Sequence, residues 1–326
     1  MSILISGGAG YIGSHMVYAA LERGTRVVVL DNLATGIRAQ VAEQAEFVQG
    51  DAGDMELVAR LIKEKSVAAV IHFAGSIIVP DSVADPLAYY ANNTVASRNL
   101  IAACIKGGVK NFIFSSTAAV YGTPEQNPVT EDTPLYPINP YGRSKLMTEW
   151  MLEDASRAHD FRYVALRYFN VAGADPKGRT GQSTPRATHL IKRACQAALD
   201  RVPALEIFGT DFPTRDGTGV RDYIHVSDLV AAHALALDHL NGGGESVTLN
   251  CGYGHGFSVR EVIDTVTKVA GHKVPTREGP RRAGDPAEIV ADAGKLKAKF
   301  NWRPAHDDLE EIVATAYHWE KRLNSA

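Results

Sequence analysis

The segment GGAGYIG at positions 7–13 constrains the fold of this chain more than any other feature. It follows a short apolar run and opens a stretch with helical spacing, so a strand, a glycine turn and a helix come in order. In that context Gly7 allows a tight turn, Gly10 lets the backbone approach a pyrophosphate, and Gly13 lets the helix pack closely on the sheet. The helix N-terminus then directs free N–H groups at the phosphates.

The acidic residue Asp31 comes at the end of a second apolar run, 26–30. A carboxylate at this place accepts hydrogen bonds from the ribose hydroxyls of an adenosine and repels a 2′-phosphate, which favours NAD over NADP. Asp51 follows a third candidate strand, where a loop can meet the adenine ring. The competing interpretation is an ordinary strand–turn–helix unit in which an aspartate only caps the helix.

Candidate strands are mostly continuous runs of Val, Ile, Leu and Phe, and candidate helices alternate with them through the first half of the chain. Such runs are typical of a parallel sheet that helices cover on both faces. We expect strands at 2–6, 26–30, 46–49, 67–72, 111–115, 162–168 and 247–250, and helices at 11–22, 54–64, 86–107, 141–159, 222–240, 258–270 and 308–322. The predicted fold class is α/β, a doubly wound parallel sheet (Rossmann) with a smaller, mixed α/β C-terminal lobe.

The texture of the sequence changes after residue 170. Two segments, 173–186 and 208–219, are rich in Gly, Pro, Thr and charged residues, and long loops of this kind are usually functional. We therefore expect a dinucleotide-binding domain and a substrate lobe. The expected domain spans 1–169, completed by segments near 222–250, and the expected lobe spans 170–221 and 251–326.

Composition excludes several classes of partner. The formal net charge of −3 gives no electrostatic reason to expect nucleic acid or an anionic membrane. We expect no targeting signal and no membrane span, because no apolar run approaches the roughly 20 residues that a bilayer requires. The three cysteines are sparse and match no metal-ligand spacing, so we expect reduced thiols, a cytoplasmic protein and no bound metal.

Tyr141 and Lys145 stand four residues apart, directly after Pro140, in a stretch with helical apolar spacing. Positions i and i+4 are neighbours on a helix, so both side chains face the same pocket. A tyrosine hydroxyl titrates near pH ~10, and a nearby ammonium lowers that pKa by favouring the phenolate. The pair is therefore a candidate proton acceptor for an alcohol, with the Thr117 hydroxyl in the same region. Taken alone, an exposed helix pair explains the spacing equally well.

These motifs together resemble the extended short-chain dehydrogenase/reductase superfamily. The motifs that carry this resemblance are 7–13, Asp31, Asp51, Ser115-Ser116-Thr117 and Tyr141-Gly142-Arg143-Ser144-Lys145. Four further segments look like the UDP-glucose 4-epimerase family within it: His72–Gly75, Arg167–Asn170, Gly217–Val226 and Arg281–Asp285. The resemblance covers nearly the whole chain.

The resemblance implies reversible epimerisation at C4 of UDP-glucose and UDP-galactose through a transient 4-keto intermediate, with tightly bound NAD taking and returning the hydride. Tyr141 would take the proton from the 4-hydroxyl, Lys145 would hold the nicotinamide ribose and lower the tyrosine pKa, and Thr117 would bind the same sugar oxygen. It also implies a homodimer formed by the helices at 86–107 and 141–159.

The resemblance further assigns binding residues. Those for the cofactor are Gly7, Gly10, Tyr11, Ile12, Gly13, Asp31, Asn32, Asp51, Ala52, Phe73, Ala74, Gly75, Asn92, Ser115, Tyr141, Lys145 and Tyr168. Those for the UDP-sugar are Thr117, Tyr141, Asn170, His189, Leu190, Phe208, Arg221, Arg282, Asp285 and Ile289. Among them Phe208 would stack on uracil, whereas Arg221 and Arg282 would contact the pyrophosphate.

The sequence departs from the family pattern at three places. Many relatives have a lysine that contacts the cofactor phosphates where this chain has Ile77, and some have a large tyrosine beside the sugar where this chain has Ile289. The loop at 173–186 is shorter and more basic than the resemblance implies.

Three alternatives stay open. Dehydratases and decarboxylating enzymes of the superfamily use acidic residues after the threonine, where this chain has Ala118 and Ala119, so both are disfavoured. A C4 epimerase for another UDP-sugar (an N-acetylhexosamine, a pentose or a uronic acid) is consistent with the same motifs. A non-catalytic dinucleotide-sensing regulator is the alternative from another class, and the Tyr141–Lys145 pair argues against it.

Overall fold

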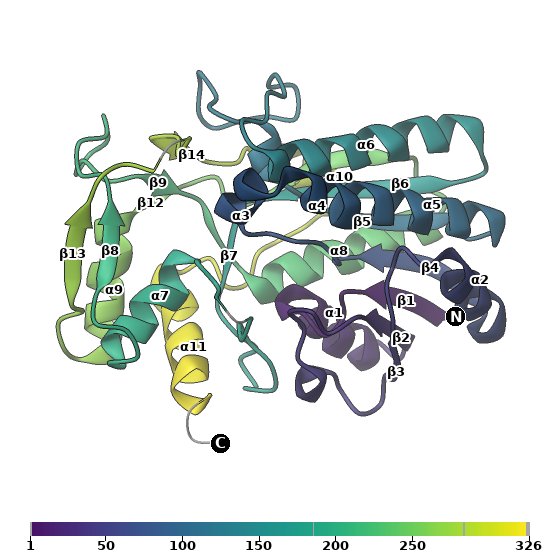
Figure 1. Ribbon diagram of the computed structural model, residues 1–326, viewed down its shortest axis with the longest axis horizontal. Helices are drawn as coiled ribbons and strands as arrows, with labels where there is room; N and C mark the ends of the chain where they lie inside the picture. The colour runs from purple at the N-terminus through teal and green to yellow at the C-terminus, as the bar shows by residue number, and fades with distance from the viewer. Residues whose placement is uncertain (1, 185, 283, 324–326) are drawn as a thin grey trace.

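A seven-stranded parallel sheet forms the centre of the computed structural model, which describes residues 2–184, 186–282 and 284–323 (Figure 1). Every neighbouring pair of strands in it is parallel. The spatial order is β11 (Val247–Cys251), β6 (Arg162–Tyr168), β5 (Asn111–Thr117), β4 (Val67–His72), β1 (Ser2–Ser6), β2 (Arg26–Asp31) and β3 (Glu46–Gln49). The predicted doubly wound fold is therefore confirmed.

Apolar side chains alternate between the two faces of this sheet because successive residues of a strand point to opposite sides. Ile3 and Ile5 of β1 pack in one core with the helices α1 (Tyr11–Glu22) and α8 (Val226–Asn241). Leu4 packs in a second core on the other face. The helices of that face are α2 (Met55–Lys65), α5 (Ala96–Lys106) and α6 (Pro140–Ala158).

The strand order reverses between β1 and β4, so the loops that leave their carboxyl ends diverge there and open a crevice. In doubly wound sheets ligands bind at such a point. The glycine turn follows β1, and Phe73–Gly75 follow β4, so both segments lie at this crevice.

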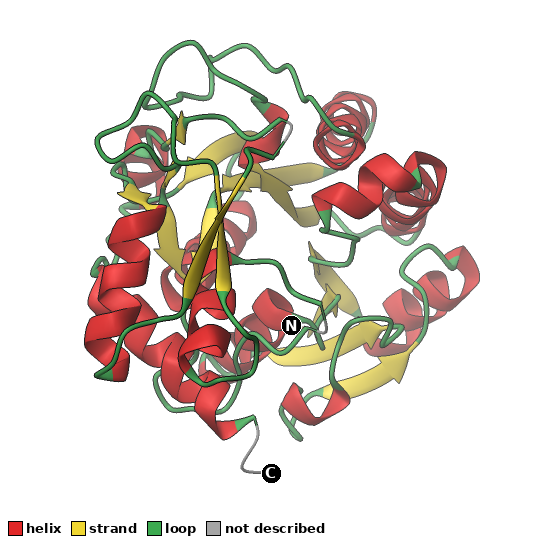
Figure 2. Ribbon diagram, turned by 60° about the vertical axis from the view of Figure 1, so that its left-hand side comes forward, coloured by secondary structure: helices red, strands yellow, loops and turns green. Residues whose placement is uncertain are grey.

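The smaller lobe contains three mutually packed helices and short strands, and Figure 2 brings it in front of the large sheet. The helices are α7 (Leu190–Ala198), α9 (Val259–Ala270) and α11 (Leu309–Arg322), and α10 (Gly294–Phe300) packs near β11. The strands are β7 (Asn170–Ala172) with β10 (Tyr223–His225), β8 (Leu205–Phe208) with β13 (Thr276–Gly279), and β12 (Phe257–Ser258), β9 (Val220–Arg221) and β14 (Glu288–Ile289) together. The boundaries between domain and lobe stay a prediction.

Two predicted helices need correction. The expected helix at 222–240 begins only at Val226, because Tyr223–His225 pair with β7 as a strand and the His225 ring accepts from the Ser227 N–H at the helix start. The expected helix at 86–107 is three segments in the structure. They are α4 (Pro86–Tyr89), the π-helical segment η2 (Tyr90–Val95) and α5, preceded by the short helix α3 (Val79–Ala84).

Other elements were not predicted at all. Sequence analysis placed no helix at α7, although its apolar residues at 190, 191, 194, 195, 197 and 198 follow helical spacing and were a usable signal. Short 3-10 turns, η1 (Arg38–Gln40) and η3 (Ala118–Val120), were also missed. Pro185 of the predicted loop and Ala283 of the Arg281–Asp285 motif lie outside the described residues.

A buried ion pair ties α6 to the sheet. The Arg167 guanidinium on β6 donates to both carboxylate oxygens of Glu149 on α6, with a closest N–O distance of 2.6 Å. Both side chains are at most 6% exposed, so neither charge has water as an alternative partner. The Arg167 Nη1 donates to the Tyr121 hydroxyl at 3.0 Å, and this hydroxyl donates to the Asn250 side-chain oxygen.

We predict that Arg167→Met lowers the free energy of unfolding by about 3–5 kcal/mol, because it leaves the Glu149 carboxylate buried without its counter-ion. Arg157→Met is the control. Arg157 lies on α6, the helix of Glu149, and its ion pair with Glu153 is exposed. This change should lower the free energy of unfolding by at most about 0.5 kcal/mol. Urea unfolding of both variants measures the difference, and equal losses would contradict this account.

Candidate active site

The glycine turn after β1 leaves no room for side chains. Gly7 has φ +74°, and a Cβ there would lie 2.5 Å from the Ala74 nitrogen. A Cβ on Gly13 would lie 2.1 Å from the Gly7 carbonyl oxygen, closer than real Cβ contacts allow. Gly10 is the N-cap of α1 and forms no side-chain cap, so the first N–H groups of the helix are available to an anion.

Asp31 lies at the end of β2 beside this turn, as predicted. Its carboxylate accepts from the backbone N–H groups of Ala9 at 2.9 Å and Leu33 at 2.8 Å, one on each oxygen. A Cβ on Gly36 would lie 2.7 Å from the same carboxylate. A carboxylate has about four acceptor sites, so two remain for ribose hydroxyls. The glycine turn has space that a Cβ would fill, and a positioned carboxylate lies beside it. Both features fit a bound dinucleotide.

Other predicted cofactor residues lie around this turn. The Asn32 amide donates to Asp51 at 3.4 Å, which brings the ends of β2 and β3 together. Phe73 and Ala74 donate their N–H groups to the Ser6 carbonyl, at 2.9 and 3.1 Å, next to the glycine turn. Ile12 and Ala52 lie in α1 and in the loop after β3.

Asn92 is exposed and donates to the Ser76 hydroxyl at 2.9 Å. Its neighbour Asn93, which sequence analysis missed, is buried in η2 and holds both the N–H and the carbonyl of Ser76. The Asn93 side-chain oxygen also lies 3.2 Å from the position of a Cβ on Gly75. Asn93 therefore fixes the backbone after β4, and a π-helical turn gave no signal in the sequence.

Lys145 is buried at the carboxyl ends of the strands. Its Nζ donates to the Ser115 carbonyl at 3.1 Å and lies 5.0 Å from the centre of the Phe114 ring. In the part of the chain that the structure describes, no carboxylate forms an ion pair with it. Burial lowers the pKa of Lys145 to about 8. An ammonium so placed favours hydroxyl and anionic partners brought by a ligand.

Tyr141 lies four residues before Lys145 on α6, and its hydroxyl is hydrogen-bonded with Thr117. Burial raises the pKa of Tyr141, and the Thr117 hydrogen bond opposes that shift. The lowering of this pKa by Lys145 stays a prediction, and in the structure the Lys145 ammonium donates to the Ser115 carbonyl. The three predicted catalytic side chains nevertheless meet in one place.

Tyr168 closes the other side of this place. It ends β6, and its hydroxyl interacts with Ser115, whose hydroxyl lies 3.0 Å from Nε2 of His233. The ring of Phe73 packs on the same histidine, with 4.9 Å between ring centres. Burial lowers the pKa of His233 to about 4, so this histidine is a neutral part of the wall.

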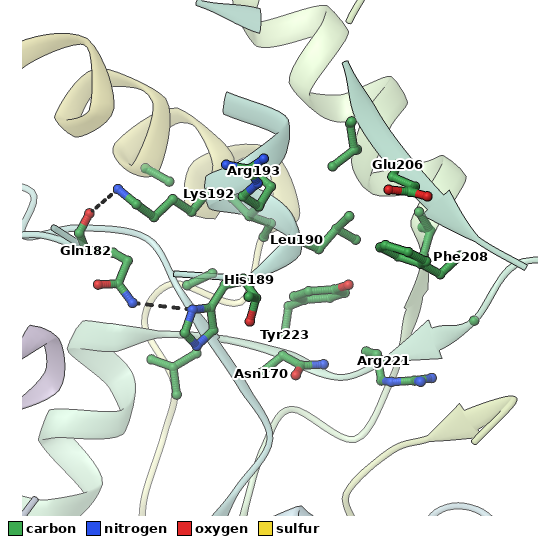
Figure 3. Close-up of a pocket in the computed structure, with 18 of the residues that line it drawn as sticks. Asn170, Gln182, His189, Leu190, Lys192, Arg193, Glu206, Phe208, Arg221 and Tyr223 are labelled. Atoms are coloured by element: carbon green, nitrogen blue, oxygen red, sulfur yellow. Dashed lines mark hydrogen bonds between the residues drawn. The ribbon is translucent and has the colours of Figure 1, made fainter. Parts of the chain in front are cut away.

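A cavity of about 460 Å³ opens in the smaller lobe, and seven predicted substrate residues line it (Figure 3). These residues are Asn170, His189, Leu190, Phe208, Arg221, Arg282 and Asp285. Tyr11, predicted for the cofactor, also lines it and donates its hydroxyl to the Gly173 carbonyl at 2.7 Å. The cavity residue Asn170 comes two residues after Tyr168, which pairs with Thr117 across β5 and β6.

Two of the four arginines that line this cavity, Arg221 and Arg282, are the ones predicted to contact the substrate. Arg221 is largely buried, donates to the Val220 carbonyl at 2.8 Å, and has its pKa lowered by burial. The Arg282 guanidinium lies 3.7 Å from the centre of the Phe208 ring, over the face that was predicted to receive a base. A guanidinium and a nucleobase are both planar and both stack on an aromatic ring, so the face of Phe208 can receive either of them.

Several lining residues were missed by sequence analysis. Tyr223 is 4% exposed, and Figure 3 shows its ring directed from β10 toward Phe208. Further polar residues of the lining are Gln182, Thr188, Lys192, Arg193, Glu206 and Arg277. The alternation of Arg221 and Tyr223 across Asp222 was a usable signal, since residues two apart on a strand share a face.

Three predicted substrate residues do not line the cavity. Thr117 and Tyr141 are residues that were also predicted to be catalytic, and Ile289 is 8% exposed in an apolar cluster with Ala118 and Leu146. Ile289 therefore flanks the residues next to Thr117 and Lys145. Ile77, at the place of the family lysine, is 41% exposed.

The described residues offer neither a helix for a membrane span nor a cluster for a metal ion. None of the helices there is both long and apolar enough to cross a membrane. No group of three or more His, Cys, Asp or Glu side chains in that part of the chain could hold a metal ion.

A doubly wound sheet with a glycine cradle, an acidic β2 end and a buried Tyr–Lys pair defines an NAD-dependent enzyme that acts on an alcohol. A model of the family described as "NAD dependent epimerase/dehydratase family" matches residues 3–252. The UDP-glucose 4-epimerase of Azospirillum brasilense is 55% identical over 324 residues, which cover 99% of this chain and 93% of that protein. The chain belongs to the NAD dependent epimerase/dehydratase family.

Solved structures agree with this assignment. The UDP-glucose 4-epimerase from Brucella ovis in complex with NAD is 43% identical, with a TM-score of 0.95 and 98% of each chain covered. The UDP-Glc/GlcNAc 4-epimerase from Campylobacter jejuni is 48% identical, with a TM-score of 0.86 and coverage of 98% of this chain and 99% of that one. The predicted family resemblance, enzyme class and NAD cofactor are confirmed.

We predict that Asp31→Ala raises the affinity for NADP relative to NAD, because a carboxylate repels a 2′-phosphate. The same change removes the acceptor of the Ala9 and Leu33 N–H groups, so the affinity for NAD should also fall. Fluorescence titration with both cofactors measures the ratio, and an unchanged ratio would remove Asp31 from cofactor selection. Asp54→Ala, which removes only the cap of α2, is the control.

Proposed function

We propose that this chain reversibly inverts C4 of UDP-glucose and UDP-galactose through a 4-keto intermediate, with the sugar between the catalytic group and the Asn170 end of the cavity. The observation that carries the proposal is how Tyr141, Lys145 and Thr117 connect the cradle to the cavity. Lys145 shares α6 with Tyr141, and its Nζ lies 3.5 Å from the position of a Cβ on Gly75. Thr117 pairs with Tyr168, two residues before the cavity residue Asn170. Ala118 and Ala119 after Thr117 offer no second acid or base, which supports epimerisation without loss of water.

The chain's own residues hold and move the proton. Tyr141 accepts the proton of the 4-hydroxyl, and Thr117, already hydrogen-bonded to it, holds the same sugar oxygen. Lys145 binds the ribose next to the nicotinamide and supplies positive charge near the phenolate. When bound, NAD would serve as the acceptor of the C4 hydride and as its donor on return. Gly7, Gly10, Gly13 and Asp31 would hold its adenosine and pyrophosphate.

The cavity suits a firmly held nucleotide and a sugar free to turn. Arg221 and Arg282 offer forked donors to a pyrophosphate, and the Phe208 face offers a stacking surface for uracil. For uracil to stack, the Arg282 guanidinium has to leave that face and move toward the phosphates. Charged and aromatic groups thus cover the nucleotide end, whereas small residues follow Thr117 at the sugar end.

The small side chain of Ile289 favours a second UDP-sugar as substrate. Ile289 is smaller than the tyrosine that some relatives carry, and it lies in the cluster beside Ala118. The extra room admits a 2-acetamido group, so we infer that UDP-N-acetylglucosamine is a substrate alongside UDP-glucose. The name of the Campylobacter jejuni relative includes both sugars, which supports this extension.

We further infer a cytoplasmic homodimer. Val83, Leu87, Val95 and Trp150 are each more than half exposed, and they lie on the neighbouring segments α3, α4, η2 and α6 (Figure 1). Large exposed apolar side chains on adjacent helices are typical of an interface. The cysteines 104, 195 and 251 are free and buried, as expected in a reducing compartment.

We expect Tyr141→Phe to lower turnover of UDP-glucose by about 10²–10⁴-fold, because it removes the positioned proton acceptor. Tyr89→Phe is the control, since that buried tyrosine donates only to the Ile78 carbonyl. Turnover, NAD content and melting temperature are measured on both. Near-wild-type turnover of Tyr141→Phe would remove the residue from the mechanism.

Replacing Ile289 by Tyr should abolish turnover of UDP-N-acetylglucosamine and spare UDP-glucose, because a clash costs several kcal/mol whereas spare room costs little. Product chromatography of both sugars with both proteins gives the comparison. Outright rejection of the acetamido sugar by the wild type would end the volume argument. Equal acceptance by the variant would show that Ile289 is not the gatekeeper.

Light scattering at micromolar concentration should give a mass of twice 35.1 kDa. Leu87→Glu should shift the protein toward the monomer, because it buries a charge in the proposed interface. Leu323→Glu, at an exposed apolar residue after α11, is the matched control and should leave the dimer intact. A wild-type monomer would refute the interface.

A further inference from the structure

His189 occupies an unusual place in the cavity wall. It is the N-cap of α7, and Figure 3 shows its ring with the Gln182 side chain on one side and Asn170 and Tyr223 on the other. Its Nδ1 lies 3.4 Å from the amide nitrogen of Gln182. One ring nitrogen is therefore engaged by the protein, and the other is left for a ligand in the cavity.

The direction of the Gln182 amide is fixed independently. Its oxygen accepts the backbone N–H of Thr184 at 3.0 Å, so the NH₂ group is the part that faces the histidine. An NH₂ group can only donate, and Nδ1 must then be an acceptor without a hydrogen. In a neutral imidazole the hydrogen is consequently on Nε2.

Gln182 is itself held by buried charges. The Lys192 ammonium donates to the Gln182 backbone carbonyl at 2.7 Å and to Glu320 at 2.6 Å. Glu320 also accepts from Arg201 at 2.7 Å and from Gln196 at 3.2 Å. Lys192, Glu320 and Gln182 are each at most 8% exposed, so this chain of contacts cannot be replaced easily by water.

The charged surroundings of His189 disfavour a second proton. Burial lowers the pKa of His189, and the Lys192 ammonium lowers it further. The other titratable or charged groups that line the cavity are mostly cationic. They are Arg193, Arg221, Arg277 and Arg282, with Glu206, Asp285, Tyr11 and Tyr223.

We propose that Gln182 holds His189 as the neutral tautomer with its hydrogen on Nε2, so that the ring donates an uncharged hydrogen bond to the diphosphate of the bound nucleotide sugar. Lys192 and Glu320 are positioning residues that act through Gln182. We take the diphosphate as the partner because Arg221 and Arg282, which the proposed function assigns to the pyrophosphate, line the same cavity as His189. This inference rests on the proposed function. It makes nucleotide affinity nearly independent of pH.

Gln182→Glu tests the tautomer. The glutamate is isosteric and can still accept the Thr184 N–H, but its second oxygen can only accept from Nδ1. The neutral ring must then present the bare Nε2 to the phosphate, and only the imidazolium can donate at both nitrogens. Affinity for UDP-glucose should therefore become strongly pH-dependent, about tenfold weaker near pH 8.5 than near pH 6.

The measurement is calorimetric titration of UDP-glucose into the NAD-loaded Tyr141→Phe protein, which binds without turnover. In that background the affinity should change by less than about threefold over the same range. The double change Gln182→Glu with His189→Asn keeps the new carboxylate and should lose the pH dependence. Equal pH dependence with and without His189, or a flat Gln182→Glu profile, overturns the inference. Absence of UDP-glucose binding in Tyr141→Phe itself would instead overturn the proposed function.

Lys192→Met tests the positioning step in the active enzyme. Glu320 keeps Arg201 and Gln196, so the carboxylate is not left alone. The Michaelis constant for UDP-glucose should rise about fivefold while kcat changes by less than about twofold, because only a binding contact is loosened. An unchanged Michaelis constant, or an equal fall in kcat, contradicts the positioning role.

Discussion

The contact between the glycine turn after β1 and the backbone after β4 is the constraint on which the site depends. Phe73 and Ala74 both donate to the Ser6 carbonyl, and this bond pattern brings Gly7 so close to Ala74 that no side chain fits. The crevice at the strand reversal is thereby narrowed into a cradle. A Cβ on Gly75, the residue after Ala74, would lie 3.2 Å from the Asn93 side-chain oxygen and 3.5 Å from the Lys145 Nζ, so this segment links the glycine turn to Lys145.

A single buried carboxylate performs the corresponding task for the smaller lobe. Asp222 is fully buried and accepts the N–H groups of Tyr253, Gly254 and Ala291, while its carbonyl accepts from Asn170. Burial raises its pKa, and those three N–H groups act against the shift. Segments far apart in sequence thus converge on one side chain. Arg221 precedes it and Tyr223 follows it, so both are aimed into the cavity.

The site contains two buried cationic side chains that have no carboxylate partner among the described residues to offset the loss of their hydration. Lys145 and Arg221 form no ion pair with any carboxylate in the described part of the chain, and burial lowers the pKa of each. Such groups cost stability in the folded protein, whereas Arg167 and Glu149 nearby offset each other. A ligand that brings phosphate and hydroxyl oxygens supplies the missing partners. A ligand that is anionic and rich in hydroxyl groups therefore gains the most free energy by binding at this site.

The sequence by itself determined the doubly wound sheet, the glycine cradle, Asp31 and the Tyr141–Lys145 pair, because these depend on periodicity and on local spacing. Local patterns do not report burial or which hydrogen bonds a side chain chooses. Only the tertiary structure decided that burial raises the Tyr141 pKa, that Asn93 rather than Asn92 is buried at Gly75, and that Tyr223 enters the cavity. It also broke the predicted helix at 222–240, because Tyr223–His225 found a strand partner in β7. Contacts between distant segments override local propensity, since a buried backbone group must be paired wherever its partner lies.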